Sequence, residues 1–206
     1  FGTKDEFVGV VKSVIHSLAP NSKLIDITHE IKAHDIRSGG LTLARSAQYL
    51  DKGIVLAVVD PGVGGSRKEV AIEVNGGDYV LVGPDNGLLP PAVAMLGEST
   101  RAVELINPKF HLPSLSATFA GRDIFAPVAA HLTLGIPLEE LGDLIPVHSL
   151  QPGILPVGGV NGEIVSAEVL WEDRFGNLQL NLAPEDIQEL GETFMLRFGE
   201  VSRRVT

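Results

Sequence analysis

The stretch GIVLAVVDPGVGGSR, residues 53–67, decides the fold of the first part of this chain. It opens with an apolar run, Gly53 to Asp60, of the kind expected for a strand buried on both faces. The run ends in an acid, turns on glycines and reaches Arg67, seven residues after Asp60. The stretch therefore predicts a buried strand whose end carries a carboxylate and a guanidinium on one glycine-rich turn.

Strand and helix patterns alternate around this stretch up to about Leu144. Apolar residues at helical spacing predict a first helix from about Phe7, with a capping box at Thr3 to Glu6. Further helices are expected over about Ile36 to Tyr49 and Arg122 to Leu134. The other predicted strands are Leu24 to Ile27, EVAIEVN at 69–75 and the start of DYVLVGPDNGLL at 78–89. Such alternation is typical of an α/β layer with a largely parallel sheet.

The pattern changes after Ile145. The segment PVHSLQPGILPVGG is rich in proline and glycine and indicates a linker. Beyond it, residues alternate like antiparallel strands around a helical turn at Pro184 to Leu190. We therefore expect an N-terminal α/β domain at 1–147 and a smaller β domain at 148–206. Because short hairpins bury little surface alone, we expect the second domain to continue beyond Thr206.

Composition excludes several classes of partner. The chain has 206 residues, 44% of them hydrophobic, and a net charge of −10 spread along its length. That charge disfavours nucleic acids and anionic membranes, because both require clustered cations. No apolar run approaches the roughly 20 residues of a membrane helix. The chain has no cysteine, which fits a cytoplasmic protein and excludes thiolate chemistry.

Several familiar motifs are incomplete in this sequence. The glycines after Asp60 resemble a dinucleotide loop, but the third glycine position is Arg67, and no P-loop is present. His29 and His34 are five residues apart, which takes them off one helical face, so no metal site is predicted. No serine lies in a nucleophile-elbow pattern.

Polar residues remain at predicted strand ends and turns. Asp60 ends one strand, Asp85 and Asn86 end another, and Asp173 and Asn177 flank a turn. Ligands of open α/β sheets bind beyond the carboxyl ends of strands, where such residues gather. Each one also suits a plain turn, because Asx side chains bond their own backbone. Taken together with Arg67 and the motif TFAGRD, the set favours a ligand site.

In order and spacing, six motifs resemble the S-adenosylmethionine hydroxide adenosyltransferase family, which includes the fluorinase and chlorinase. They are FGTKDEFVG, IDITHEI, AVVDPGVGGSR, VGPDNGLL, TFAGRDIFAPVAAHL and DRFGN. The resemblance implies an α/β domain joined to a smaller β-barrel-like domain, in a trimer with active sites between subunits. The implied reaction is displacement of methionine from C5′ of S-adenosylmethionine by water or hydroxide, which yields adenosine. Family members carry a Thr-Asp before the Phe-Gly, and here that residue and the C-terminal adenine-binding stretch lie outside the chain.

The chemistry suits an acid beside an arginine. The sulfonium of S-adenosylmethionine is already a good leaving group, so no metal or cofactor is expected and the protein must only align and partly desolvate a nucleophile. A carboxylate held bidentately by a guanidinium orients one water. We therefore expect Asp60 and Arg67 to hold the attacking water. By resemblance they are two members of an Asp-Arg-His triad.

The third member of that triad is missing, because Ala120 occupies the histidine position of the family motif. Alanine accepts no proton, and loss of a general base costs about 10²–10⁴-fold in rate. Ala120 is compatible with an engineered substrate trap, a natural variant of weak or altered activity, or a pocket for another nucleophile. The alternatives to a hydrolase are therefore a S-adenosylmethionine-binding protein without turnover and a halide-using adenosyltransferase. Since halide-using relatives lack the aspartate of the DPGVG turn, we rank hydroxide chemistry first.

The resemblance assigns the remaining site residues by position. Thr118, Phe119 and Gly121 are expected to line the nucleophile pocket. Asp173 matches the carboxylate that pairs with the methionine ammonium, and Asn177 an amide that contacts the nucleoside. His34 falls at a wall position of the pocket.

Overall fold

A computed structural model of the chain describes residues 1–113, 117–154, 156–188 and 190–205. The chain forms two compact units, Phe1–Ile154 and Leu155–Thr206. The first unit contains a five-stranded sheet in the order β1-β3-β2-β4-β5. Its strands are β1 (Gly53–Leu56), β2 (Glu69–Val74), β3 (Tyr79–Pro84), β4 (Ser99–Glu104) and β5 (Asp143–Ile145).

The sheet is mixed, and the expectation of a largely parallel sheet was wrong. Only β1 and β3 pair in parallel, whereas β2 pairs antiparallel with β3 and with β4, and β4 pairs antiparallel with β5. The reason lies between β2 and β3. Val74 pairs with Tyr79 in the register, so only the four residues 75–78, Asn-Gly-Gly-Asp, join the two strands. That link is far too short for a parallel crossover and suits a hairpin.

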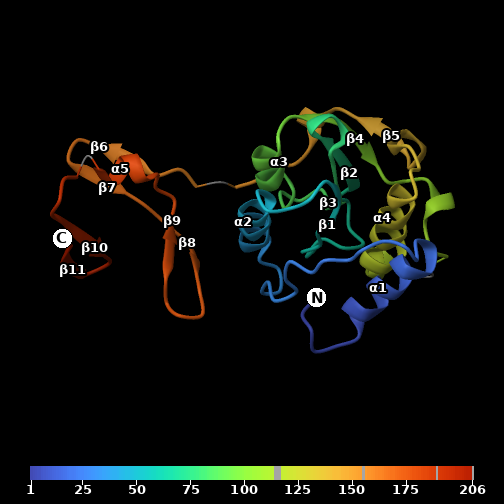
Figure 1. Ribbon diagram of the computed structural model, residues 1–206, viewed down its shortest axis with the longest axis horizontal. Coiled ribbons are helices and arrows are strands. Elements are labelled where there is room, and N and C mark those ends of the chain that lie inside the picture. Colours follow the sequence, from blue (N-terminus) through green and yellow to red (C-terminus); the bar gives the residue numbers. More distant parts are fainter. Residues whose placement is uncertain (114–116, 155, 189, 206) are drawn as a thin grey trace. The chain divides into compact units, whose positions relative to one another are not determined.

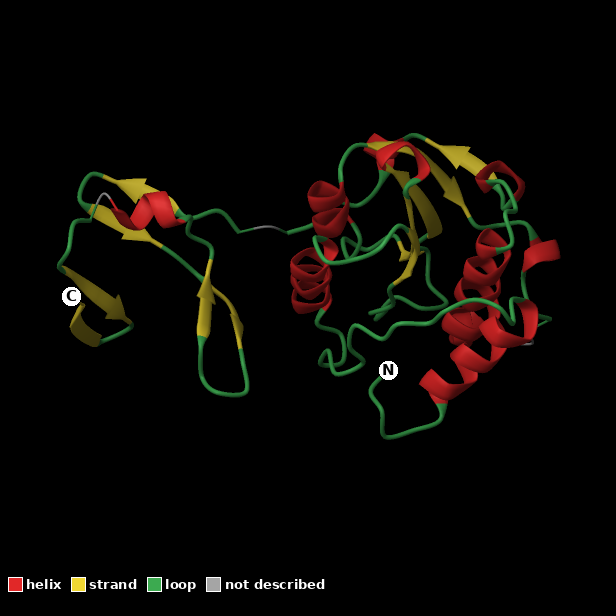
Figure 2. Cartoon of the chain, viewed as in Figure 1, coloured by secondary structure: helices red, strands yellow, loops and turns green. Residues whose placement is uncertain are grey.

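Helices cover both faces of this sheet (Figure 1). The first layer contains α2 (Ile36–Ala47) and α3 (Pro90–Leu96), which pack against Val70, Ile72 and Val74 of β2. The second contains α4 (Ala126–Thr133), which packs against Ala71. Helix α1 (Phe7–Leu18) packs on α4. Alternate side chains of β2 point to opposite faces of the sheet. Val70, Ile72 and Val74 are buried on one face and Ala71 on the other, so the sheet forms the central one of three layers (Figure 2).

Short helical turns link these elements. They are η1 (Asn75–Gly77), η2 (Pro108–Phe110), η3 (Ala117–Phe119), η5 (Leu138–Glu140) and η6 (Val147–Ser149), together with the π-helical turn η4 (Gly121–Phe125). The helix expected over Arg122 to Leu134 therefore begins as a π turn and continues as α4. Such π turns inside helices are frequent at functional sites.

Two local expectations were wrong. Leu24 to Ile27 form no strand; Ile25 is 78% exposed, so the segment has apolar residues but no sheet to cover. The capping box at the first helix also does not form. Thr3 donates instead to Glu30 (2.6 Å), and Asp5 accepts the backbone N–H of Phe7 (3.1 Å).

The second unit contains antiparallel strands, as expected, around α5 (Pro184–Gln188). They form three separate two-stranded sheets: β6 (Gly159–Asn161) with β7 (Ile164–Ser166), β8 (Val169–Glu172) with β9 (Leu178–Leu180), and β10 (Phe194–Phe198) with β11 (Val201–Val205). Within the described residues of this unit, no closed barrel is present, which corrects the barrel-like expectation. Each strand pairs only with its hairpin partner, so no strand joins one sheet to the next.

Candidate functional site

Asp60 and Arg67 lie together, as the sequence predicted. Arg67 Nε donates to Asp60 Oδ1 across 2.8 Å, and Arg67 Nη2 donates to Asp60 Oδ2. Glycines shape the turn between them. Gly64 has a φ of 74°, and a Cβ on Gly62 would lie 3.2 Å from Arg67 Cγ. The side chains are only 6% and 10% exposed, so the pair is a two-point ion pair largely shielded from water.

Arg67 also binds a second carboxylate, which the sequence analysis missed. Its Nη1 lies 2.6 Å from Glu69 Oε1, and its guanidinium lies 5.7 Å from the centre of the Phe125 ring. Burial lowers the pKa of Arg67, but hydrogen bonds with Asp60 and Glu69 outweigh burial and hold the pKa above its usual value. Arg67 therefore stays charged and cannot serve as a base. The signal for Glu69 was its place two residues after Arg67, at the start of β2.

Asp85 and Asn86 hold loops in place beside this pair. Asn86 Nδ2 donates to the carbonyl of Val59 (2.9 Å), and its Oδ1 accepts the N–H of Leu88 (3.2 Å). Asp85 Oδ1 accepts the N–H of Gln151 (2.8 Å), and burial raises its pKa. Asn86 also borders a hollow in the first unit, which is lined by Ile36, Arg37, Gly40, Asn86, Gly87, Pro91, Pro152 and Ile154. Asn86 therefore connects this hollow with the residue before Asp60.

Ala120 lies in the core behind the same turn. It is 3% exposed and belongs to a buried cluster with Phe125. Val58 and Val63, on either side of Asp60, pack against that cluster. Position 120 and the residues on either side of Asp60 therefore share one apolar cluster. No proton-accepting side chain is supplied at position 120.

Aromatic rings surround the other residues of this motif. Phe119 is 40% exposed and lies stacked 6.0 Å from Phe7, centre to centre. A Cβ on Gly121 would lie 2.8 Å from Phe1 Cζ, so the glycine permits the close packing of these rings. Arg122 lies 4.7 Å over the Phe119 ring and binds Asp123 through two bonds of 2.6 Å and 3.0 Å.

For the remaining predicted residues, a place beside the Asp60 pair stays a prediction. Thr118 is exposed, and so is His34, which has a φ of 69°. In the second unit, Asp173 Oδ2 accepts from Asn177 Nδ2 (2.7 Å) and Asp173 Oδ1 accepts the Asn177 N–H (2.8 Å). The side-chain bond from Asn177 is the main cause of the lowered pKa of Asp173. These bonds close a hairpin turn, so ligand contacts by the two residues stay a prediction.

The described residues offer neither a metal site nor a membrane span. No group of three His, Asp or Glu side chains is placed to hold a metal ion. No helix in the described part of the chain is long and apolar enough to cross a membrane.

Comparison with known proteins identifies the family. The model of the SAM hydroxide adenosyltransferase N-terminal domain matches residues 1–142. The chain belongs to this family. SAM hydroxide adenosyltransferase relatives include a (R)-S-adenosyl-L-methionine hydrolase of Salinispora tropica, 45% identical over 180 residues that cover 87% of this chain and 68% of the relative. The Thermus thermophilus (R)-S-adenosyl-L-methionine hydrolase is 44% identical, with 86% of this chain and 69% of the relative covered.

More distant relatives and solved structures agree with this assignment. A fluorinase of Actinoplanes sp. is 24% identical over 92% of this chain and 71% of its own length. The crystal structure of an uncharacterized conserved protein from Thermotoga maritima superposes with a TM-score of 0.90 at 35% identity, covering 98% of this chain and 78% of that one. The SAM hydroxide adenosyltransferase fold of this chain is thus shared along nearly its whole length.

Proposed function

We propose that this chain hydrolyses S-adenosyl-L-methionine to adenosine and L-methionine. The observation that carries the proposal is the two-point pair of Asp60 and Arg67 on the turn after β1. It stands in a chain that is 44–45% identical to proteins named (R)-S-adenosyl-L-methionine hydrolase. A carboxylate fixed by a guanidinium supplies an acceptor oxygen of fixed direction, which orients a water for in-line attack.

The reaction needs little beyond this orientation. The water oxygen forms a bond to C5′ while the C5′–S bond breaks, and the electron pair leaves on the sulfur of methionine. Because the sulfonium is already cationic, the proposed reaction uses no metal or cofactor, and S-adenosylmethionine is the substrate. Arg67 cannot take the proton that water loses, and neither can Ala120, so the proton passes to Asp60 or to solvent.

Other residues complete the proposed site by position in the family motifs. Thr118, Phe119 and Gly121 line the nucleophile pocket, and the exposed ring of Phe119 is available for such a contact. Asp173 and Asn177 contact the methionine and nucleoside parts of the substrate, and His34 forms a wall of the pocket. The active assembly is a cytoplasmic homotrimer with sites between subunits.

Ala120 favours a second candidate function. With an alanine where the family motif has a histidine, the chain keeps Asp60 and Arg67 but lacks the natural proton acceptor. The second candidate is therefore a protein that binds S-adenosylmethionine without hydrolysing it. The first candidate is a hydrolase whose turnover is slow.

Chromatography of the products separates these candidates. The protein is incubated with S-adenosylmethionine, adenosine and methionine are quantified, and binding is measured by calorimetry. In the hydrolase, Asp60→Asn lowers adenosine formation by about 10²-fold or more, because the acceptor charge is lost while the shape is kept. The control variant Asp78→Asn removes a surface partner of Lys52 and leaves adenosine formation unchanged. Tight binding without adenosine establishes the binding protein instead, and equal rates for Asp60→Asn and the parent chain contradict the proposed role of the pair.

A further inference from the structure

Arg67 lies between two carboxylates rather than beside one. Asp60 occupies Nε and Nη2 of the guanidinium, and Glu69 occupies Nη1. The three side chains are 6%, 10% and 25% exposed, for Asp60, Arg67 and Glu69 respectively. This cluster, Asp60-Arg67-Glu69, therefore carries one more negative than positive charge in a largely desolvated place.

Two neighbouring groups in the described part of the chain could offset the extra charge, and neither does so. Lys68, the residue directly before β2, pairs with another acid, Glu104, at 2.7 Å. His111 interacts electrostatically with Glu69, but burial lowers its pKa, so it is neutral at pH 7. The cluster thus keeps two carboxylates on one guanidinium, with Lys68 paired to a different acid.

An excess negative charge acts differently on different nucleophiles. It repels a halide or hydroxide ion that binds beside the cluster, but it does not repel a neutral water. It also attracts the cationic sulfonium of the substrate. Coulomb interactions of this kind are several times stronger in a partly desolvated site than in bulk water. A neutral cluster, with Arg67 paired to a single acid, lacks this discrimination.

We propose that Glu69 is a specificity-determining residue that makes the Asp60-Arg67-Glu69 cluster select neutral water over anionic nucleophiles. The inference rests on the proposed function, and it names the nucleophile that function uses. With water, the O–C5′ bond forms, the C5′–S bond breaks and one proton is released. With chloride, a Cl–C5′ bond forms, methionine leaves in the same way and no proton is released.

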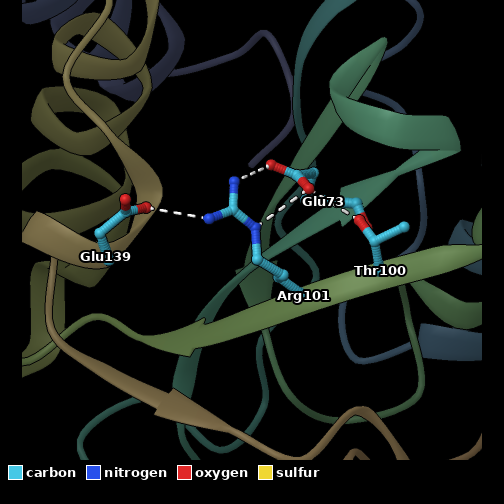
Figure 3. Close-up of polar contacts among 4 residues, drawn as sticks. All are labelled: Glu73, Thr100, Arg101 and Glu139. Atoms are coloured by element: carbon cyan, nitrogen blue, oxygen red, sulfur yellow. Dashed lines mark hydrogen bonds and ion pairs between the residues drawn. The ribbon is translucent and has the colours of Figure 1, made fainter.

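The chain contains a matched control for this cluster on the same strand. Glu73 binds Arg101 at 2.5 Å, and Arg101 also binds Glu139 at 3.1 Å (Figure 3). This second acid-arginine-acid group has an Arg101 side chain that is 45% exposed, against 10% for Arg67. Four residues along a strand place Glu73 about 13 Å from Glu69, away from the proposed site.

The test compares Glu69→Gln with Glu73→Gln in the full chain. Glutamine keeps the shape and a hydrogen-bond acceptor for arginine but removes the charge. Each variant is incubated with S-adenosylmethionine and chloride, and chromatography measures 5′-chloro-5′-deoxyadenosine against adenosine. We expect the ratio of chlorinated product to adenosine to rise about tenfold or more in Glu69→Gln and to stay unchanged in Glu73→Gln. Equal ratios in the parent chain and Glu69→Gln overturn the inference.

Chloride binding supplies a readout independent of turnover. Broadening of the ³⁵Cl resonance by protein reports bound chloride, and thermal melting verifies that both variants are folded. More broadening with Glu69→Gln than with the parent chain or Glu73→Gln supports the inference even if no adenosine forms, in which case only the proposed hydrolysis fails. Equal broadening in all three proteins overturns the inference even if adenosine does form.

Discussion

The side chain of Asn86 donates a hydrogen bond of 2.9 Å to the carbonyl of Val59, the residue directly before Asp60. The loop after β3 thereby holds the end of the chain segment that follows β1. Asn107 makes the same pair of contacts elsewhere: its amide donates to the carbonyl of Glu140 (2.7 Å), and its oxygen accepts the N–H two residues on (3.1 Å). The two asparagines make the same kind of contacts, but those of Asn86 are part-buried and those of Asn107 are exposed.

We expect Asn86→Ala to lower the free energy of unfolding by about 1–3 kcal/mol, because it leaves a part-buried backbone carbonyl without its donor. Asn107→Ala should lower it by less, because water can replace the donor at the exposed carbonyl of Glu140. Only Asn86→Ala should also lower adenosine formation, since only it releases the segment that carries Asp60. Urea unfolding and the product assay measure the two effects. If both variants lose activity equally, the positioning role of Asn86 is refuted.

Restoring the motif histidine should restore a proton acceptor. We expect Ala120→His to raise adenosine formation by about 10²–10⁴-fold. Ala120 is 3% exposed, so the larger side chain should cost about 1–3 kcal/mol of stability. Ala129→His, at a buried position of α4 that is 4% exposed, should cost stability without any gain in rate. Persistent binding with no recovery in Ala120→His would favour the binding protein.

The close approach of β3 to Ala57, the residue directly after β1, depends on Gly83. A Cβ at this position would lie 2.3 Å from the carbonyl oxygen of Ala57, which is backbone and cannot move aside. We expect Gly83→Ala to destabilise the fold by about 3 kcal/mol or more. Gly9→Ala, on the open face of α1, should instead raise stability by about 0.5–1 kcal/mol. Equal melting temperatures for the two variants would contradict this account.

Stability should fall in mild acid because of His111. Burial lowers the pKa of His111 below its usual 6.5, and its Nε2 is buried with no hydrogen-bond partner among the described residues. The usual value applies to the unfolded chain and the lowered pKa to the folded one, so between them the unfolded chain binds more protons. The free energy of unfolding therefore declines as pH falls below about 6.5. We expect urea unfolding of His111→Gln to show a flatter pH dependence from pH 7 to 5. His16→Gln, at an exposed position of α1, should keep the parent slope; a parent-like slope in His111→Gln would refute the assignment.

Local sequence patterns predicted most of the elements that surround the site. The apolar run Gly53 to Asp60 predicted a strand, and the strand is present as β1, but it ends at Leu56. The expected burial on both faces was wrong, because β1 is an edge strand with no fully buried residue. The turn that follows places Asp60 against Arg67, as predicted. The expected sheet direction was wrong, although residues 75–78, Asn-Gly-Gly-Asp, carry a hairpin signal. The strand predicted over Leu24 to Ile27 was wrong for another reason. A strand forms only beside another strand, and a local sequence pattern does not show whether such a neighbour is present.

By itself the sequence determined the family motifs, the alternation of buried strands and helices, and the glycine-rich turn that brings an acid to an arginine. These features depend on residues close together in the chain, where backbone sterics and side-chain periodicity act directly. Only the tertiary structure decided that Arg67 also binds Glu69, that Asn86 holds Val59, and that Ala120 lies in the core. The contacts of Asn86 and Ala120 arise where separate elements pack on one another, because which side chains meet there depends on register and layer order. Glu69 is close to Arg67 in the chain, but the direction of its side chain depends on where β2 begins.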